Sequence, residues 1–383
     1  MALPRTLFDE EHEAFRQSCK AFIDKHIAPN NKNWAEAGQV DRELWREAGK
    51  QGLLGIAVPE QYGGGGVTDF RFNVVLDEEL TRAMAGGVGF PVHNDLIEPY
   101  LRRLATDEQK QRWLPGFCSG DLVTAIAMTE PGAGSDLQAI RTTAIRDGDH
   151  YLLNGQKTFI SNGIHADLVL VAAKTDPSQG ASGLSIIVVE RNTPGFERGR
   201  NLDKIGLKAQ DTAELFFSDA RVPVANLLGE EGQGFRYLIE NLVRERVTIA
   251  VIAVAAAESM LESTLQYCKD RKAFGRSIGS FQHNRFLLAE LATEVQIART
   301  FVDRCITDHA DGDTLDIPTA AMAKWWTTEL QTKVADRCLQ LHGGYGYMSE
   351  YPIAQAFLDS RVQTIYGGTT EIMKEIIGRG MGL

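Results

Sequence analysis

The chain has 383 residues, 43% hydrophobic and 24% charged, and is therefore long enough to bury more than one hydrophobic core. The formal net charge is −11 and acidic and basic residues are mixed along the chain, which argues against nucleic acid as a partner. No run of about 18 apolar residues and no apolar stretch after Met1 is present, so we expect neither a stable membrane anchor nor an export signal.

The first third of the chain is predicted to be helical. Apolar residues recur with helical spacing from residue 15 to residue 23, and this helix should end before Pro29. Asp41 stands where it can cap the next helix. Thr106 followed by Gln109 forms a capping-box pattern, which predicts the start of a further helix.

The sequence pattern of the middle third is typical of a β domain. Short β-rich runs are separated by turn pairs and glycine-containing loops, and they occupy residues 122–129, 151–160, 168–173, 184–189 and 213–217. Asp147-Gly148 and Asn154-Gly155 are typical hairpin turns. We therefore predict an antiparallel β domain.

Long helices return after Gly234, over 235–269, 281–309 and 317–341, and two shorter ones follow Glu350 and Thr369. These helices suit a bundle. The order of helices, strands and helices lacks the alternation of a Rossmann domain, so we predict an α+β multidomain chain divided at 1–122, 123–232 and 233–383.

The five cysteines are scattered, without a Cys-x-x-Cys pair or metal-ligand spacing to the eight histidines. This pattern predicts reduced structural thiols, no metal site and a cytoplasmic location.

Two segments of the β domain could approach a ligand. Residues 127–136 combine small residues and hydroxyls after the first predicted strand, as in a loop that cradles an anionic or heteroaromatic group, although a plain Gly-Ser turn is the alternative. In the second segment, Phe159 and Ser161 are two residues apart and should lie on one side of a strand, where they could stack on and hydrogen-bond a flat ring. An inward-facing Phe and a turn Ser would give the same local pattern.

Two further segments lie in the helical bundle. Residues 271–275 read either as a basic helix end closed by Gly275 or as a pyrophosphate site around Arg271. Residues 340–347 and 365–371 are glycine-rich breaks, for which close backbone approach to a bound molecule is one reason. His342 within the first break is, by itself, more typical of a core histidine.

Taken together and in this order, the segments resemble the acyl-CoA dehydrogenase family over essentially the whole chain. Residues 127–139 fit the first signature of the family, and residues 340–359 fit the second except at Gln355, where the family normally has Lys or Arg. The likeness is strongest to the long-chain members, through residues 206–217 and 365–375.

The resemblance implies a helical N-terminal domain, a central β-barrel or sandwich and a C-terminal four-helix bundle, with FAD between the last two. It also implies a homotetramer active in fatty acid β-oxidation, with electron-transfer flavoprotein or a similar acceptor. The implied FAD contacts are Met128, Thr129, Gly134, Ser135, Phe159, Ser161, Thr369 and Glu371, with Arg271, Phe274, Gln340 and Gly344 reaching the FAD of a neighbouring subunit. The implied substrate contacts are His93, Ser135, Leu242, Arg246, Tyr366 and Gly367.

Family chemistry requires a carboxylate that removes the α-proton of the thioester while the β-hydrogen leaves as hydride. Most members place this Glu directly after the equivalent of Tyr366, where this chain has Gly367. A minority, including the long-chain and isovaleryl enzymes, place it on a bundle helix before an Arg, which identifies Glu245 before Arg246 as the candidate base. Gly367 would keep a second role, as a backbone N–H donor to the thioester oxygen.

The helical neighbours of Glu245 support this choice because Leu242, Ile249 and Ile252 form an apolar face. Burial there should raise the pKa of Glu245, whereas Arg246 or a helix dipole would lower it. The alternative is an exposed Arg-Glu-Arg strip.

Other functions stay open at this point. They are an acyl-CoA oxidase, another flavin oxidase or monooxygenase on the same scaffold, and a non-catalytic flavoprotein. The length and branching of the acyl chain also stay open. Residues 89–100 should line the pocket for its tail, and yet they include Asn94, Asp95 and Pro99, which are not typical of a simple apolar tunnel.

Overall fold

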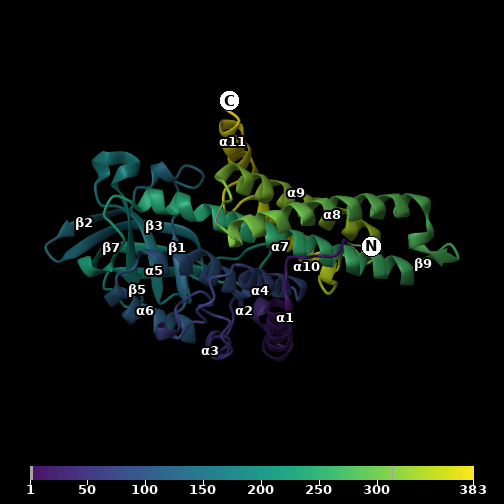
Figure 1. Cartoon of the computed structure of the whole chain (residues 1–383), viewed down its shortest axis with the longest axis horizontal. Coiled ribbons are helices and arrows are strands. Elements are labelled where there is room, and N and C mark those ends of the chain that lie inside the picture. The colour runs from purple at the N-terminus through teal and green to yellow at the C-terminus, as the bar shows by residue number, and fades with distance from the viewer. Residues whose placement is uncertain (1–2, 313) are drawn as a thin grey trace.

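The computed structural model describes residues 3–312 and 314–383. Six helices form the N-terminal part: α1 (Glu10–Phe22), α2 (Asn31–Ala37), α3 (Arg42–Lys50), α4 (Arg71–Arg82), α5 (Glu98–Leu104) and α6 (Asp107–Ser119). Two π-helical turns, Ile23–Ile27 and Val92–Ile97, extend α1 and precede α5. Figure 1 shows α1 and α4 beneath the long helices and α6 beneath the sheet.

The predicted helix ends are largely confirmed. The first helical run ends at Ile27, before Pro29. Thr106 and Gln109 form the capping box, with each side chain accepting from the backbone N–H of the other at 3.2 and 2.9 Å. The prediction for Asp41 was half wrong, because Asp41 is the N-cap of α3 but its carboxylate accepts from the Trp34 indole at 2.9 Å instead of from the helix.

The middle part is a sheet with strand order β6-β7-β3-β2-β4-β5-β8, and β1 pairs with β4. The strands are β1 (Thr124–Ala127), β2 (Thr143–Asp147), β3 (His150–Ser161), β4 (Leu168–Lys174), β5 (Leu184–Glu190), β6 (Phe196–Asn201), β7 (Thr212–Pro223) and β8 (Leu227–Leu228). Most pairs are antiparallel. The predicted antiparallel β domain is confirmed by these pairs, and the exceptions are β1 and β2, which both pair with β4 in parallel.

Strand β4 is buried on both faces, which explains its continuous apolar sequence. Leu168 and Leu170 pack in one core with Trp113 and Phe117 of α6, whereas Val169 belongs to a second core inside the β domain. The sheet is thereby fixed to the N-terminal helices.

Two features of the sheet differ from expectation. Asn154-Gly155 is not a turn but lies within β3, where Gly155 takes φ 146° beside a register irregularity. Strand β6 was not predicted because its sequence, FERGRN, does not alternate between apolar and polar residues. A polar sequence is common in an edge strand, and β6 lies at the edge of the sheet.

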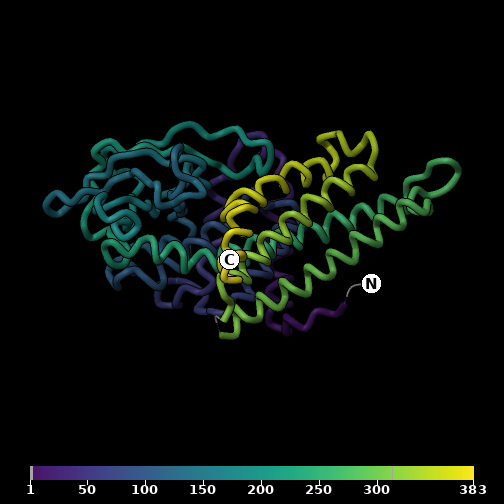
Figure 2. The backbone as a smooth tube through the Cα atoms, turned by 90° about the horizontal axis from the view of Figure 1, so that it is seen from above, coloured from purple at the N-terminus to yellow at the C-terminus, as the bar shows by residue number. Residues whose placement is uncertain are grey.

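The C-terminal part is a bundle of α7 (Gly234–Asp270), α8 (Gln282–Ala310) and α9 (Ile317–His342), followed by α10 (Pro352–Ser360) and α11 (Thr370–Gly380). Figures 1 and 2 show the three long helices side by side along the long axis. Helix α7 spans about 55 Å at 1.5 Å per residue. Its length and composition would allow it to cross a membrane, but 67% of its most apolar window is buried, as in the core helix of a folded domain.

The two ends of α7 lie in different surroundings. Gly234 packs against Leu184 and Ser185 of the sheet. At the other end, β9 (Lys272–Ala273) and β10 (Arg276–Ser277) form a small hairpin that projects away from the sheet (Figure 1). Residues near the start and the end of α7 therefore lie far apart in one chain.

Candidate active site

Glu245 lies on α7 and is only 3% exposed. Burial raises the pKa of its carboxyl to about 7, and the neighbouring charge of Arg246 opposes this shift. The Oε1 atom is buried without a hydrogen-bond partner. The alternative of an exposed Arg-Glu-Arg strip is therefore wrong. The pKa of the Glu245 carboxyl lies near neutral pH instead.

The loop around Gly367 meets α7 one helical turn from Glu245. Arg246 Nε donates to the Gly367 carbonyl at 3.5 Å. A Cβ added to Gly367 would lie 2.4 Å from Cδ1 of Ile249, which is four residues after Glu245 and on the same helix face. Gly367 also has φ 63°, so a side chain at this position would strain the backbone and would require the end of the Ile249 side chain to shift. The structure thus places Gly367 against α7, within one helical turn of Glu245.

Lys324 anchors the same loop, a role that the sequence did not predict. Its side chain is fully buried, and its Nζ donates to the Gly368 carbonyl at 2.6 Å. Burial lowers the pKa of Lys324 to about 8, and the nearby charge of Arg246 lowers it further. The signal that could have revealed it is a single Lys among apolar residues at 320–326.

We expect Lys324→Met to loosen this loop because the thioether cannot donate to the Gly368 carbonyl. A hydrogen bond from a charged donor contributes about 1.5–3 kcal/mol, so turnover should fall about tenfold or more. Steady-state rates with a saturating acyl-CoA would measure the effect, and Lys333→Met, which removes an exposed ion pair with Glu294, is the control. Unchanged turnover in Lys324→Met would show that this anchor is dispensable.

Three other predicted residues belong to the same loop. The Tyr366 hydroxyl donates to Gln363 Oε1 at 2.8 Å, and burial raises the pKa of Tyr366 above its usual range. Thr369 caps α11 by accepting from the Ile372 backbone, and Glu371 in the first turn of α11 is exposed. All of them lie within five residues of Gly367.

The loop after β1 is supported by a buried ion pair. Lys157, which is 1% exposed, donates to the Met128 carbonyl at 3.0 Å and to Glu130 Oε1 at 2.8 Å. Gly134 and Ser135 stay exposed at the tip, and a Cβ added to Gly134 would meet no atom within 4 Å. The loop is therefore fixed at its base and open at its tip, as a ligand-binding loop requires.

Phe159 does not follow the strand alternation from which its position was predicted. It takes φ 60° within a register shift between Lys157 and Ile160, so it stands on a bulge of β3 and not simply on the side of Ser161. Its ring is 69% exposed, which also contradicts an inward-facing Phe. The Thr158 N–H donates to the Thr129 carbonyl at 2.9 Å and joins the bulge to the loop after β1.

These features fit FAD. An exposed aromatic ring next to a loop with open space and hydroxyl groups can stack on and hydrogen-bond a flat heteroaromatic system. The residues that would do so are Met128, Thr129, Gly134, Ser135, Phe159 and Ser161, of which Ser161 and Thr129 are partly buried.

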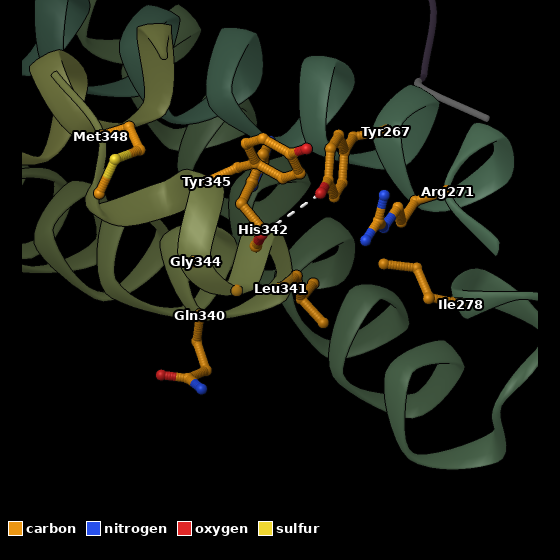
Figure 3. A pocket seen from close by; sticks show the side chains of 10 residues that line it. Tyr267, Arg271, Ile278, Gln340, Leu341, His342, Gly344, Tyr345 and Met348 are labelled. Carbon is orange, nitrogen blue, oxygen red and sulfur yellow. Dashed lines mark hydrogen bonds between the residues drawn. The ribbon is translucent and has the colours of Figure 1, made fainter. Parts of the chain in front are cut away.

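The remaining predicted cofactor contacts lie at the other end of the bundle. Arg271, Gln340 and Gly344 line a pocket of about 530 Å³, drawn in Figure 3. Tyr267 stacks on His342 at 4.1 Å between ring centroids and donates to its carbonyl at 3.3 Å. His342 also bonds the Cys338 carbonyl, which fits the core role that was considered for it.

Phe274 lies at the tip of the β9–β10 hairpin, in the segment between the pocket residues Arg271 and Ile278, and is 94% exposed. Phe274 and Gly275 both have positive φ, so Gly275 closes a hairpin and not a helix, which corrects the helix-end interpretation. The pocket lies at the C-terminal end of α7, whereas the Phe159 bulge belongs to the sheet against which the N-terminal end of α7 packs (Figure 1), so one chain does not bring the two sets of predicted cofactor contacts together.

His93 was predicted to contact the substrate, but the structure places it in the protein core. It is fully buried, its Nδ1 is 2.8 Å from the Thr124 hydroxyl and its Nε2 is 3.1 Å from the Phe117 carbonyl. Burial lowers the pKa of His93 to about 3, and its ring stacks on Phe117 at 3.6 Å. With both nitrogens engaged, His93 is a core residue. Leu242, by contrast, is half-buried on α7, one turn before Glu245.

Comparisons with known proteins cover nearly the whole chain. The family models for the N-terminal, middle and C-terminal domains of acyl-CoA dehydrogenase match residues 9–121, 125–220 and 232–382. The long-chain specific acyl-CoA dehydrogenase of Sus scrofa mitochondria is 49% identical over 377 residues, covering 98% of this chain and 87% of the relative.

Solved structures agree with the sequence matches. The acyl-CoA dehydrogenase from Geobacillus kaustophilus is 51% identical, with a TM-score of 0.97 and full coverage of both chains. A glutaryl-CoA dehydrogenase from Mycobacterium smegmatis in complex with FADH2 is 28% identical, with a TM-score of 0.90 and coverage of 98% and 95%.

Proposed function

This chain belongs to the acyl-CoA dehydrogenase family of FAD-dependent oxidoreductases, and we propose that it desaturates medium- to long-chain acyl-CoA thioesters, straight or branched, with Glu245 as the base. The observation that carries the proposal is the buried, unpartnered carboxyl of Glu245 beside the Gly367 loop. The product would be the trans-2-enoyl-CoA.

In this mechanism Glu245 removes the α-proton, and its raised pKa makes the carboxylate a stronger base than an exposed Glu. FAD, held by the loop after β1 and the Phe159 bulge, would supply the acceptor for the hydride that leaves the β-carbon. The Gly367 N–H donates to the thioester oxygen, where negative charge develops. Arg246 and Lys324 hold the Gly367 and Gly368 carbonyls and so fix the direction of that N–H.

The surroundings of the reaction are proposed as well. FAD would be held by the loop after β1, the Phe159 bulge and the loop of Thr369 and Glu371, and by Arg271, Phe274, Gln340 and Gly344 of a neighbouring subunit in a homotetramer. The separation of these two sets within one chain supports such an arrangement. We propose electron-transfer flavoprotein or a similar protein as the acceptor, and a cytoplasmic location.

The function can be tested by anaerobic mixing of the FAD-loaded protein with acyl-CoA thioesters from butyryl- to stearoyl-CoA, with branched and aryl chains included. We expect rapid loss of flavin absorbance and formation of enoyl-CoA, fastest with medium to long chains. Peroxide formation at turnover rates without a mediator would instead indicate an oxidase. An oxidised flavin with every thioester would refute the proposal.

The rate of flavin reduction should depend on pH through Glu245. The base acts as the carboxylate, and its pKa lies at about 7, so kcat/KM should rise with pH through this value and then level off. At one pH unit below the pKa, about a tenth of the maximal value should remain. Stopped-flow traces at several pH values would check this, and a profile without a step near neutral pH would contradict it.

A further inference from the structure

Buried polar atoms without partners are concentrated beside Glu245. Among the described residues other than His309, fourteen buried side-chain nitrogen and oxygen atoms have no hydrogen-bond partner in this geometry, and nine of them belong to two facing groups at this one place. Asp77 can pair with Asp95 and Tyr100 with Asn241, which leaves five atoms, on Glu98, Arg244, Glu245 and Thr248, without a partner. Leaving such an atom unpaired costs free energy, so a natural protein rarely collects them unless something else supplies the partners.

The first group lies on α7. Residues spaced by three, four and seven positions share one helix face, and here they are Asn241, Arg244, Glu245 and Thr248. Arg244 contributes both Nε and Nη2, and its guanidinium also lies 4.7 Å from the Phe70 ring centre. This face offers hydrogen-bond donors as well as acceptors.

The second group comes from the elements that pack against this face. It consists of Asp77 on α4, Asp95 on the π-helical turn, and Glu98 and Tyr100 on α5, none more than 2% exposed. Asp95 Oδ1 accepts from Asn73 at 2.7 Å and is 3.7 Å from Arg244 Nη2, and the carboxyl of Asp95 also shares a hydrogen bond with that of Asp77. We call these two facing groups the polar chamber.

We propose that the polar chamber binds a hydroxyl group on the acyl chain, so that hydroxylated acyl-CoA thioesters are the preferred substrates. The inference rests on the proposed function, because Glu245, the proposed base, forms part of the chamber wall. It explains why residues 89–100 do not read as an apolar tunnel.

A hydroxyl suits the chamber better than a charged group. Burial raises the pKa of both Asp77 and Asp95, which favours a protonated carboxyl, and Arg244 balances a remaining negative charge. A second carboxylate would meet three acidic side chains, and an ammonium would meet Arg244. A hydroxyl can donate to a carboxyl and accept from Asn241 or Arg244 at the same time.

The test compares matched acyl-CoA thioesters of one chain length, with a single hydroxyl moved along the chain beyond the α- and β-carbons, or with none. We expect the kcat/KM ratio of hydroxylated to unsubstituted substrate to reach at least tenfold at one position. If unsubstituted chains match or exceed hydroxylated ones at every position, the inference fails while the proposed function stands. If neither class reduces the flavin, the proposed function itself fails.

Variants in each of the two groups test whether the hydroxyl preference arises in the polar chamber. Asp95→Leu and Asn241→Leu replace the polar group by an apolar one of similar size, and each should lower the hydroxyl preference about tenfold. Asp95→Asn should retain more of it. Glu78→Gln is the control, because Glu78 is equally buried on α4 but pairs with Arg5, Arg16 and Arg299 outside the chamber. A preference that survives both Leu variants would overturn the assignment to this chamber.

Discussion

Glu245→Gln should abolish flavin reduction by acyl-CoA, with a loss on the order of 10⁴-fold, because general-base catalysis typically contributes 10²–10⁴-fold and the variant has no other placed base. Glutamine has nearly the same shape, so the neutral amide fits the buried position of Glu245. FAD and acyl-CoA should therefore still bind. Anaerobic stopped-flow measurement of flavin absorbance gives the rate, and equilibrium titration gives the affinities.

Glu240→Gln is the matched control for this experiment. Glu240 lies on the same helix, its side chain is 43% exposed, and it forms surface ion pairs with Arg103 and Arg236. Its flavin should be reduced at the normal rate. Normal bleaching in Glu245→Gln would show that another group removes the α-proton.

Gly367→Ala should reduce turnover about 10²-fold, the loss seen when an oxyanion donor is displaced. The added methyl group would stand 2.4 Å from Ile249 Cδ1, which must shift, and an alanine at φ 63° strains the backbone that carries the N–H donor to the thioester oxygen. The rate of flavin reduction with saturating acyl-CoA measures the effect.

A second substitution separates crowding from backbone strain. Ile249→Ala removes the atom that the new methyl group would strike, so the double variant should recover a part of the lost rate. Gly378→Ala, in α11 with open space around the added methyl group, is the control and should leave the rate unchanged. A normal rate in Gly367→Ala would show that close approach of this loop is not needed.

The helices and the order of the three parts could be predicted from sequence because periodicity and caps act locally. Strand β6 and the Phe159 bulge could not, since a polar edge strand has no alternation and a bulge depends on its pairing partner. The division at residues 122 and 232 stays a prediction.

Prediction of the site was limited in the same way. Glu245 was found through the family pattern and its apolar neighbours. Lys324 was missed because its role depends on the Gly368 carbonyl, 44 positions away along the chain. The polar chamber draws on segments from residue 77 to residue 248, and His93 was misassigned because its partners Thr124 and Phe117 are distant in sequence.

The burial of Glu245 also has a thermodynamic consequence for the whole fold. The carboxyl holds its proton up to about pH 7 when folded but only to about 4.5 in the unfolded chain. Between these values the folded chain binds more protons, so rising pH withdraws stability, by roughly 3 kcal/mol in all. Above about pH 7, where Glu245 is the carboxylate that can act as the base, its burial therefore lowers the stability of the folded protein.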